Sequence, residues 1–573
     1  MAVARLALTS FAEGEVRLSD EVEVYQRTYN TLLRSSGETQ LRVLESSHRA
    51  MGSSLHPLAA SEELDLGAFI YAIRRLPDGI VGAKLVVMGQ DAEAMSASGI
   101  PVESWREAEA PARRRRWYDS GTGTLAVLMA SVSDVDDLLP TLVAFQIEWN
   151  KIRVRMRAAG WPEAPASPEE CARELGGSPD DWARLRGAWG ARFGERMALI
   201  GGRRLSLRVR MLGGTHTGYA RLTRRWWAPV SAELAVEGLS ERPLYFVSSN
   251  SHSLVNIVTG IAREHELQLV EFVDHMDEQD ILHQELTAFR EGRTEGSWEN
   301  FLYFVARLYF SARGERGAAE RRAAEQQKGV THLRSKTALR VPAQVIPLAA
   351  LHPAALDPRL GQVDAEALAA SGAVVVNIDY PLGVAAYNIL REVAVDRTAL
   401  RGVYVLGKAA TLNADVGDVM ISSVVHDEHS GSTYWLDNAF GVDDLAPYLR
   451  FGTGLDNQRA VTVKSTFLQN RSYLDFYYRE AFTVVEMEAG PYCNAVYEIA
   501  DADRHPVGEA VNFSKLPIDL GIIHYASDTP YTQARTLGAQ GLSYYGMDST
   551  YASSLAILRR ILRLEGVLDG GRD

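Results

Sequence analysis

Apolar positions in the first half of the chain recur mostly at helical spacing. Asp20 and Glu23 have the spacing of a capping box, and an apolar stripe with helical period follows them as far as Gly37. Similar stretches are residues 64–76, 136–157, 254–262 and 298–311. One short apolar run, 244–247, reads as a strand that leads into a polar turn at 248–253. The pattern predicts a mixed, mainly helical region.

The second half has a different pattern, in which short β-branched runs alternate with helical stretches. The strand-like runs are residues 344–346, 373–378, 402–406, 419–425, 460–463, 482–485 and 520–525. The helical stretches include 384–393, 494–500 and 549–564. This alternation predicts an α/β fold with a central, mostly parallel sheet. Ligands of such sheets bind beyond the carboxyl ends of the strands, so polar residues that follow a strand are the candidates for a site.

Between the two halves lies a stretch without an apolar face. Residues 313–328 are rich in Ala, Glu, Arg and Gln, which is typical of a solvated helix or a linker. We therefore place a domain boundary near Gly329. The prediction is a mainly helical region of unknown role at 1–329 and an α/β domain at 330–573.

Charge and cysteine content narrow the range of functions. The 573 residues carry a formal net charge of -13, which argues against a general nucleic-acid or anionic-membrane binder. Only Cys171 and Cys493 occur, so a disulfide framework is excluded and a reducing cytoplasm is favoured. The first 17 residues already carry Glu13 and Glu15, unlike a secretory signal, and no apolar run is long enough to span a bilayer. We expect a cytoplasmic protein that binds neither membranes nor nucleic acid.

Two segments near the C-terminus place reactive side chains at the ends of apolar runs: residues 486–488 read Glu-Met-Glu, and residues 526–528 read Ala-Ser-Asp. Cleavage of a nucleoside's N-glycosidic bond needs side chains of these kinds. One carboxylate can accept hydrogen bonds from both vicinal ribose hydroxyls and favours the oxocarbenium character that the sugar develops. A partly buried Asp with a raised pKa can protonate the leaving base.

These segments resemble the nucleoside phosphorylase and nucleosidase superfamily, which includes the methylthioadenosine/S-adenosylhomocysteine nucleosidases and the hexameric purine nucleoside phosphorylases. The resemblance covers residues 340–566 and implies a three-layer α/β domain. It implies that Glu488 holds the ribose diol, that Met487 packs against the sugar, and that Glu486 belongs to the same wall. Asp528 would be the acid for the purine ring, and Ser527 would orient it. We count Asp528, Ser527 and Glu486 as catalytic and Glu488 and Met487 as substrate-binding.

The resemblance extends to weaker motifs upstream. Gly407 and Lys408 lie where the superfamily has a glycine-containing turn after a central strand, and Gly383 lies where it has a glycine-rich turn into a helix. Phe467 and Leu468 resemble the segment that gives the base an aromatic face and backbone contacts. All five are therefore expected to bind substrate. By resemblance the protein is an enzyme, forms a homo-oligomer, takes a purine nucleoside or nucleotide, and needs no cofactor and no metal.

Departures from the pattern bear on the reaction type. The hexameric phosphorylases bind phosphate with an Arg where this chain has Val405, and Lys408 replaces a usual Ser. This favours hydrolysis, with phosphorolysis as the alternative if Lys408 holds inorganic phosphate as a co-substrate. The hydrolases activate water with a Glu after the first strand, and after residues 345–348 only His352 is available. A further alternative is a non-catalytic nucleoside sensor.

Each candidate also has a plainer interpretation. Glu486 and Glu488 could end a solvated strand, Asp528 could cap a helix, Phe467 could fill a core and Lys408 could lie on the surface. Three polar segments have plain readings too. The four arginines at 113–116 are typical of a solvated face. The turn at 248–253 is more typical of a helix cap than of a phosphate-binding site. The segment 426–429 is more typical of a polar loop than of a metal site.

Overall fold

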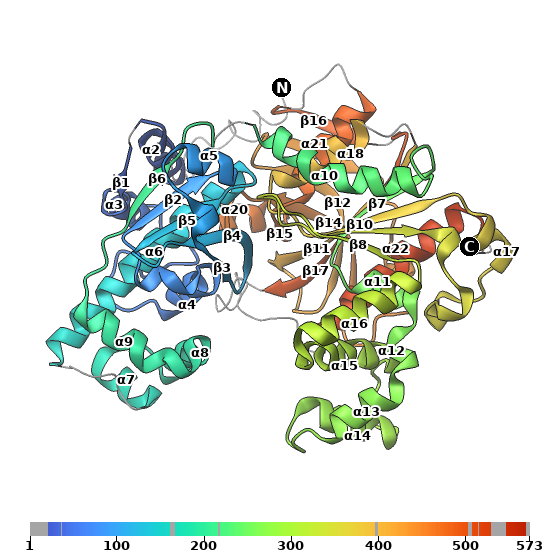
Figure 1. Cartoon of the computed structure of the whole chain (residues 1–573), viewed down its shortest axis with the longest axis horizontal. Coiled ribbons are helices and arrows are strands. Elements are labelled where there is room, and N and C mark those ends of the chain that lie inside the picture. The colour runs from blue at the N-terminus through green and yellow to red at the C-terminus, as the bar shows by residue number, and fades with distance from the viewer. Residues whose placement is uncertain are drawn as a thin grey trace.

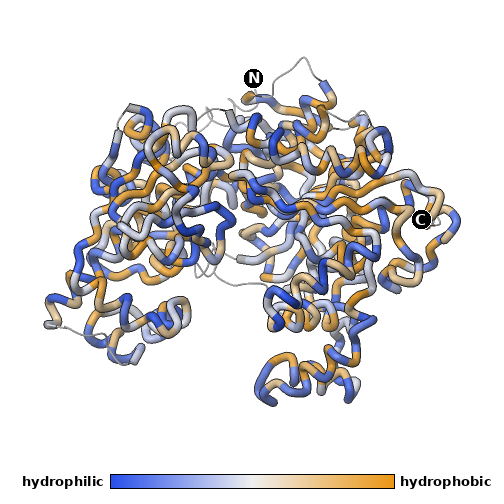
Figure 2. Tube along the Cα trace, in the orientation of Figure 1, coloured by the Kyte–Doolittle hydropathy of each residue, from blue (hydrophilic) through white to orange (hydrophobic). Residues whose placement is uncertain are grey.

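Two β-sheets, each with its own helices, organise the chain in the computed structural model (Figure 1). The structure describes residues 21–35, 37–160, 167–215, 218–395, 399–501, 507–513, 515–528 and 546–568. The elements from α2 (Glu21–Ser35) to β6 (Arg208–Met211) form the first unit, and those from α10 (Tyr219–Val236) onward form the second unit. Figure 2 shows apolar residues concentrated along the strands of both sheets.

The first unit is built on a six-stranded sheet. In sheet order its strands are β1 (Thr39–Gln40), β6, β2 (Leu85–Gly89), β5 (Thr124–Leu128), β4 (Arg113–Asp119) and β3 (Arg106–Ala110). β6, β2 and β5 run parallel, and the others pair antiparallel. The sequence predicted a mainly helical region here, because these strands are short and β4 begins with four arginines, which carry no apolar alternation.

Alternate side chains of the central strands explain why helices cover both faces of this sheet. Val86 and Val127 face one core, whereas Val87 and Ala126 face the other. The first core is closed by α3 (Arg42–Ala50), α4 (Leu66–Arg75), α6 (Val132–Ala158), α7 (Pro168–Leu175), α8 (Pro179–Trp189) and α9 (Phe193–Gly202), and the second by α5 (Ala92–Ala97) and the start of α10. α6 is buried on most sides, so its sequence shows little amphipathicity.

The second unit is built on a larger, mixed sheet. Its main path is β16 (Ala510–Phe513), β13 (Ser432–Leu436), β12 (Val419–Asp427), β14 (Gly454–Thr462), β15 (Val484–Glu486), β11 (Leu400–Thr411), β7 (Leu244–Ser249), β10 (Val374–Asp379), β9 (Ala343–Pro347) and β8 (Thr331–Leu333), and β17 (Asp519–Asp528) pairs with β11 and β12. β10, β7, β11 and β17 are parallel neighbours. The pairs β8–β9, β9–β10, β11–β15 and β12–β13 are antiparallel, so the sheet is less uniformly parallel than the sequence suggested.

The larger sheet begins earlier in the chain than the boundary expected near Gly329. β7 precedes that position by 80 residues or more, yet it lies between β10 and β11 in the centre of the sheet. The structural division between the sheets therefore falls between β6 and α10. Sequence reasoning missed this because a single strand, 244–249, is separated from the rest of its sheet by a long helical segment.

Helices cover both faces of this sheet, which makes three layers (Figure 1). One face carries α10, α18 (Ala385–Val395) and α21 (Ala489–Ala500), and the other carries α11 (Ser253–Thr259), α15 (Trp298–Ala312) and α22 (Met547–Leu564). The expected linker is α16 (Gly314–Gln327), which packs on α15. A Cβ at Gly317 would lie 2.2 Å from the Phe310 carbonyl oxygen, so small residues, not an apolar face, allow this contact. Buried Glu325 pairs with Arg321 and His332.

A segment of the second unit joins the two units by entering the first. It comprises η7 (Thr466–Leu468) and the start of α20 (Arg471–Arg479). Leu468 belongs to the core of the first unit, and Phe467 packs against Tyr71 with ring centres 5.2 Å apart. The Ser54 amide donates to the Gln469 carbonyl oxygen over 2.7 Å. The units are therefore fixed to each other by core packing and backbone hydrogen bonds.

Candidate functional site

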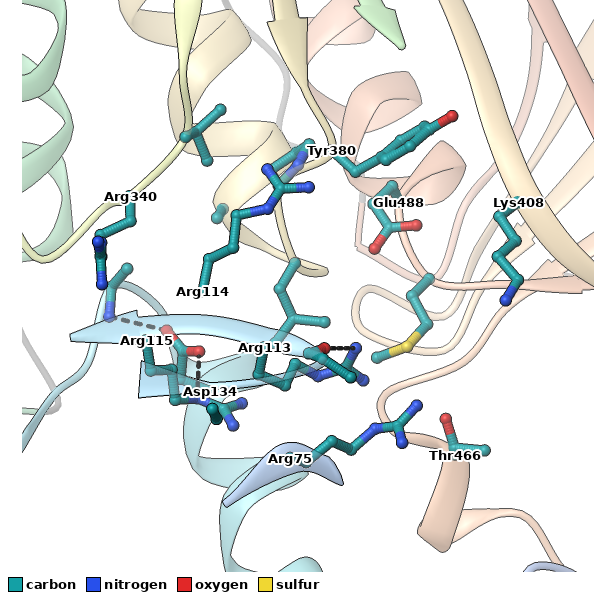
Figure 3. Close-up of a pocket in the computed structure, with 18 of the residues that line it drawn as sticks. Arg75, Arg113, Arg114, Arg115, Asp134, Arg340, Tyr380, Lys408, Thr466 and Glu488 are labelled. Carbon is teal, nitrogen blue, oxygen red and sulfur yellow. Dashed lines mark hydrogen bonds and ion pairs between the residues drawn. The ribbon is translucent and has the colours of Figure 1, made fainter. Parts of the chain in front are cut away.

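A cavity of about 1170 Å³ lies between the two units (Figure 3). On the second-unit side it is lined by residues at or after the carboxyl ends of β10, β11, β15 and β17. On the first-unit side it is lined by α4, β4 and the loop before β4. Five of the residues selected from the sequence line it: Lys408, Glu486, Met487, Glu488 and Ser527.

Glu488 is the carboxylate that opens into this cavity. It is the N-cap residue of α21, and its Oε1 accepts a 3.3 Å hydrogen bond from the Gly383 amide. Its surroundings are poor in water, and this desolvation raises the pKa of Glu488 to about 7, although the Gly383 amide and the charge of Arg113 oppose the rise. Glu488 can therefore carry or release a proton near neutral pH.

Glu486 is held more tightly than Glu488. It is 3% exposed, its Oε2 accepts 2.6 Å hydrogen bonds from the amides of Glu488 and Ala489, and its Oε1 accepts from the Thr462 hydroxyl. Burial, and then the charge of Glu488, raise the pKa of Glu486 to about 8 against these three donors. Glu486 thus accepts hydrogen bonds from the first amides of α21 and holds the backbone of Glu488 in place. Its catalytic role stays a prediction.

The acid predicted for the base lies at the end of β17. The backbone of Asp528 pairs with Ala410 of β11, but its side chain is outside the described part of the structure. Ser527, next to it, lines the cavity and donates a 3.1 Å hydrogen bond to the Ala409 carbonyl oxygen. The structure therefore places this strand end at the cavity and leaves the orientation of Asp528 by Ser527 as a prediction.

Lys408 and Met487 line the cavity, whereas Gly407 does not. As viewed in Figure 3, the Glu488 carboxyl lies between Lys408 and the arginines. A Cβ at Gly407 would lie 2.8 Å from the ring of His524, so this glycine makes room for a buried histidine of β17. Gly407 is thus explained by packing, and no contact with a ligand in the cavity is indicated for it.

Gly383 contributes at a point where the units touch. Its φ is +54°, and a Cβ there would lie 2.2 Å from Ser133 Oγ at the start of α6. Its amide reaches Glu488, while the next amide, that of Val384, donates to Ser133 Oγ over 3.0 Å. Any side chain at Gly383 would separate this turn from the first unit and disturb a hydrogen bond to Glu488.

Phe467 and Leu468 do not line the cavity, although the neighbouring Thr466 does. Phe467 is 1% exposed and packs among Tyr71 and the rings of His48 and His56 in the first unit. Phe467 therefore fills a core, as its plainer interpretation proposed. The core that it fills belongs to the other unit, which the sequence could not indicate.

His352, the weak candidate for activating water, follows β9 at the end of the sheet where β10 begins, opposite to the cavity. β9 runs antiparallel to β10, and its last residue, Pro347, pairs with Val374, the first residue of β10. The chain after β9 therefore leaves the sheet away from the carboxyl ends of β7, β10 and β11. His352 is exposed and accepts a hydrogen bond from the Ala354 amide.

The arginines of β4 were expected to form a solvated face, and the structure corrects this. Arg113, Arg114 and Arg115 line the cavity, and Arg115 is 4% exposed. Arg114 reaches across to the second unit and pairs with Asp379 at the end of β10, with 2.7 Å between Nη2 and Oδ1. Only Arg116 stays outside the lining and pairs with Glu107 over 3.5 Å. A run of four arginines gives no alternation, so the sequence could not show this arrangement.

The remaining polar clusters have structural partners. Asn250 Oδ1 accepts from the amides of His252 and Ser253, so the turn 248–253 caps α11. In the segment 426–429, Asp427 accepts from Asn494 while Glu428 accepts from Tyr477. Across the described residues, no group of three or more His, Cys, Asp or Glu side chains is placed to hold a metal ion.

Comparison with known proteins places the chain in a family. A family model described as "Family of unknown function (DUF6909)" matches residues 41–563. The chain belongs to this family. The matched range runs through both units and covers β4 as well as the residues before α21. No curated protein matches the chain.

Two solved structures of low sequence identity align with part of the DUF6909 chain. A 5′-methylthioadenosine/S-adenosylhomocysteine nucleosidase from Campylobacter jejuni is 13% identical over 42% of this chain and 92% of its own, with a TM-score of 0.27. A purine nucleoside phosphorylase from Toxoplasma gondii is 13% identical over 44% of this chain and 88% of its own, with a TM-score of 0.28. TM-scores this low support no conclusion about function. Within the described ranges, no helix combines the length and hydrophobicity needed to cross a membrane.

Proposed function

We propose that this protein cleaves the N-glycosidic bond of a purine nucleoside or nucleotide. The observation that carries the proposal is the position of Glu488, which opens into a cavity bounded by the carboxyl ends of β10, β11, β15 and β17. This is where α/β sheets bind ligands, and the lining includes Glu486, Met487 and Glu488 together with Ser527. The Glu488 carboxylate would accept hydrogen bonds from the 2′ and 3′ hydroxyls of ribose and favour positive charge on the sugar.

The leaving base requires a proton, and Asp528 is proposed to supply it. Support comes from the β17 backbone, which ends beside Ala410 at the cavity. Met487 would pack against the sugar. Glu486 would hold the start of α21, and thereby Glu488, in place. The scheme needs no cofactor.

Hydrolysis is favoured over phosphorolysis because Val405 stands where the hexameric phosphorylases have a phosphate-binding Arg. Lys408 lines the cavity and keeps phosphorolysis as the second candidate. A homo-oligomer is a separate prediction, which light scattering on the purified chain tests.

One experiment separates these functions from a sensor. The protein is incubated with a panel of purine nucleosides and nucleotides, with and without inorganic phosphate, and free base is measured by chromatography. Base without phosphate indicates a hydrolase, and base only with phosphate indicates a phosphorylase. Binding without turnover, unchanged in Asp528→Asn, indicates a sensor and contradicts the proposal.

A further inference from the structure

The first-unit wall of the cavity holds more positive charge than its carboxylates neutralise. Arg113 pairs with Asp137 through two hydrogen bonds of 2.9 and 3.1 Å. Arg115 pairs with the same Asp137 over 2.7 Å and with Asp134 over 2.8 Å. Arg75, beside them, forms no ion pair with any described residue. Three buried or half-buried arginines therefore share two aspartates.

Arg75 is the unusual member of this group. It is 5% exposed, and its guanidinium carbon lies 3.3 Å from the centre of the Tyr71 ring. Its Nη1 donates to the Tyr71 carbonyl oxygen, while its Nε has no hydrogen-bond partner among the described residues. Buried arginines are almost always paired with an anion, because burial of an unpaired charge is costly. Burial lowers the pKa of Arg75 to about 10, which agrees with an uncompensated cation.

Two neighbours on the same wall also have unused hydrogen-bonding groups. Arg115 Nη1 and the Tyr71 hydroxyl are buried, and neither has a partner within the described ranges. Each buried group left unpaired destabilises the fold, because it loses its hydrogen bonds to water without replacement. An anion with several acceptor oxygens would satisfy such groups together, and a phosphate group has this chemistry.

We propose that this wall binds the phosphate of a nucleoside 5′-monophosphate, with Arg75 as its principal ligand beside Arg113 and Arg115. The inference rests on the proposed function for the position of the phosphate. If Glu488 accepts hydrogen bonds from both the 2′ and the 3′ hydroxyl, C5′ is the sugar position left to carry a phosphate. The cavity of about 1170 Å³ exceeds the roughly 300–1,000 Å³ of ordinary small-molecule sites, so it has room for a nucleotide.

The same chemistry could come from inorganic phosphate acting as a co-substrate, and the test separates the two sources. The full-length protein is assayed for binding by calorimetry, and for base release, in phosphate-free buffer with adenosine, 5′-AMP and 3′-AMP. One further arm adds inorganic phosphate to adenosine. Guanosine, inosine and their 5′- and 3′-monophosphates are assayed in the same way. We expect 5′-AMP, or the 5′-monophosphate of the preferred base, to exceed its nucleoside and the 3′-isomer at least 10-fold in affinity.

Arg75→Met removes the charge while keeping an apolar side chain of similar length. We expect it to reduce the 5′-AMP to adenosine affinity ratio at least 10-fold, and we expect Arg75→Lys to retain part of that ratio. Arg116→Met is the matched control, because Arg116 belongs to β4 but lies outside the cavity lining. Its ratio should equal that of the wild type. Melting temperatures of all variants show whether each one folds.

Several results would overturn the inference: equal binding of nucleoside and 5′-monophosphate, an unchanged ratio in both Arg75 variants, or enhancement by inorganic phosphate alone. Failure of the proposed function looks different. In that case 5′-AMP binds through Arg75, but no base is released with any substrate. The phosphate site would then stand and the glycosidase would not.

Discussion

The two walls of the cavity hold their ionisable groups in different ways. Arg113 and Arg115 of the first unit are anchored by Asp134 and Asp137. Glu488 of the second unit stands at the start of a helix, and its pKa is raised to about 7. Although burial opposes it, Asp137 raises the pKa of Arg113, which therefore stays charged across the physiological range, whereas the Glu488 carboxylate changes its charge near neutral pH. The first-unit wall is thus suited to binding an anion, whereas the second-unit wall is suited to a reaction that moves a proton.

The largest effect is expected on the second-unit wall. Asp528→Asn removes the proposed proton donor while conserving size, so base release should fall about 10²–10⁴-fold, the usual contribution of a general acid. Binding of the substrate should survive, which calorimetry can check. Full activity in this variant would remove Asp528 from the mechanism.

Glu488→Gln should weaken both binding and turnover. A neutral amide can still hydrogen-bond one ribose hydroxyl, but it loses the charge that favours the oxocarbenium-like sugar. We expect kcat/KM to fall about 10²-fold, comparable to loss of one electrostatic contact in a transition state. If this variant kept its activity while Arg75→Met lost it, the assignment of chemistry to the second-unit wall would be wrong.

The carboxylates also predict a pH dependence. The folded pKa values of Glu486 and Glu488, about 8 and about 7, lie above the unfolded value of 4.5. Their contribution to stability is therefore fully present below pH about 4.5 and is lost as pH rises through about 7 to 8. The melting temperature of Glu488→Gln should depend less on pH between 5 and 8 than that of the wild type. An identical pH slope of the melting temperature in both proteins would contradict the account.

The pKa of Glu488 also predicts how activity depends on pH. Because the ionised form binds the diol, activity should fall as pH drops below about 7.

The smallest effect concerns Phe467, which the sequence placed near the base. Phe467→Leu leaves a core residue of smaller volume among Tyr71, His48 and His56, so the free energy of unfolding should fall by about 1 kcal/mol. Denaturant titration measures this loss. Substrate affinity should not change, because Phe467 does not line the cavity. A large rise in KM with unaltered stability would return Phe467 to the site.

The sequence predicted the second unit better than the first. Runs such as 374–379 and 419–427 are apolar and β-branched, so their strands were visible, and the Glu-Met-Glu segment was found because strand ends carry ligands. β4 was missed because its arginines are paired with aspartates of α6, a tertiary feature that no local pattern contains. The position of β7 in the larger sheet was likewise hidden, because its neighbours are supplied by strands more than a hundred residues away.

Release of free base in phosphate-free buffer is the most direct test of the central claim, that the second-unit carboxylates cleave a purine nucleotide or nucleoside held in this cavity. The wild type is incubated with 5′-AMP, 5′-GMP, 5′-IMP and their nucleosides, and base and reducing sugar are measured together. The account predicts equal amounts of base and sugar from the wild type and almost none from Asp528→Asn. Intact substrates throughout, or equal release by both proteins, would contradict it.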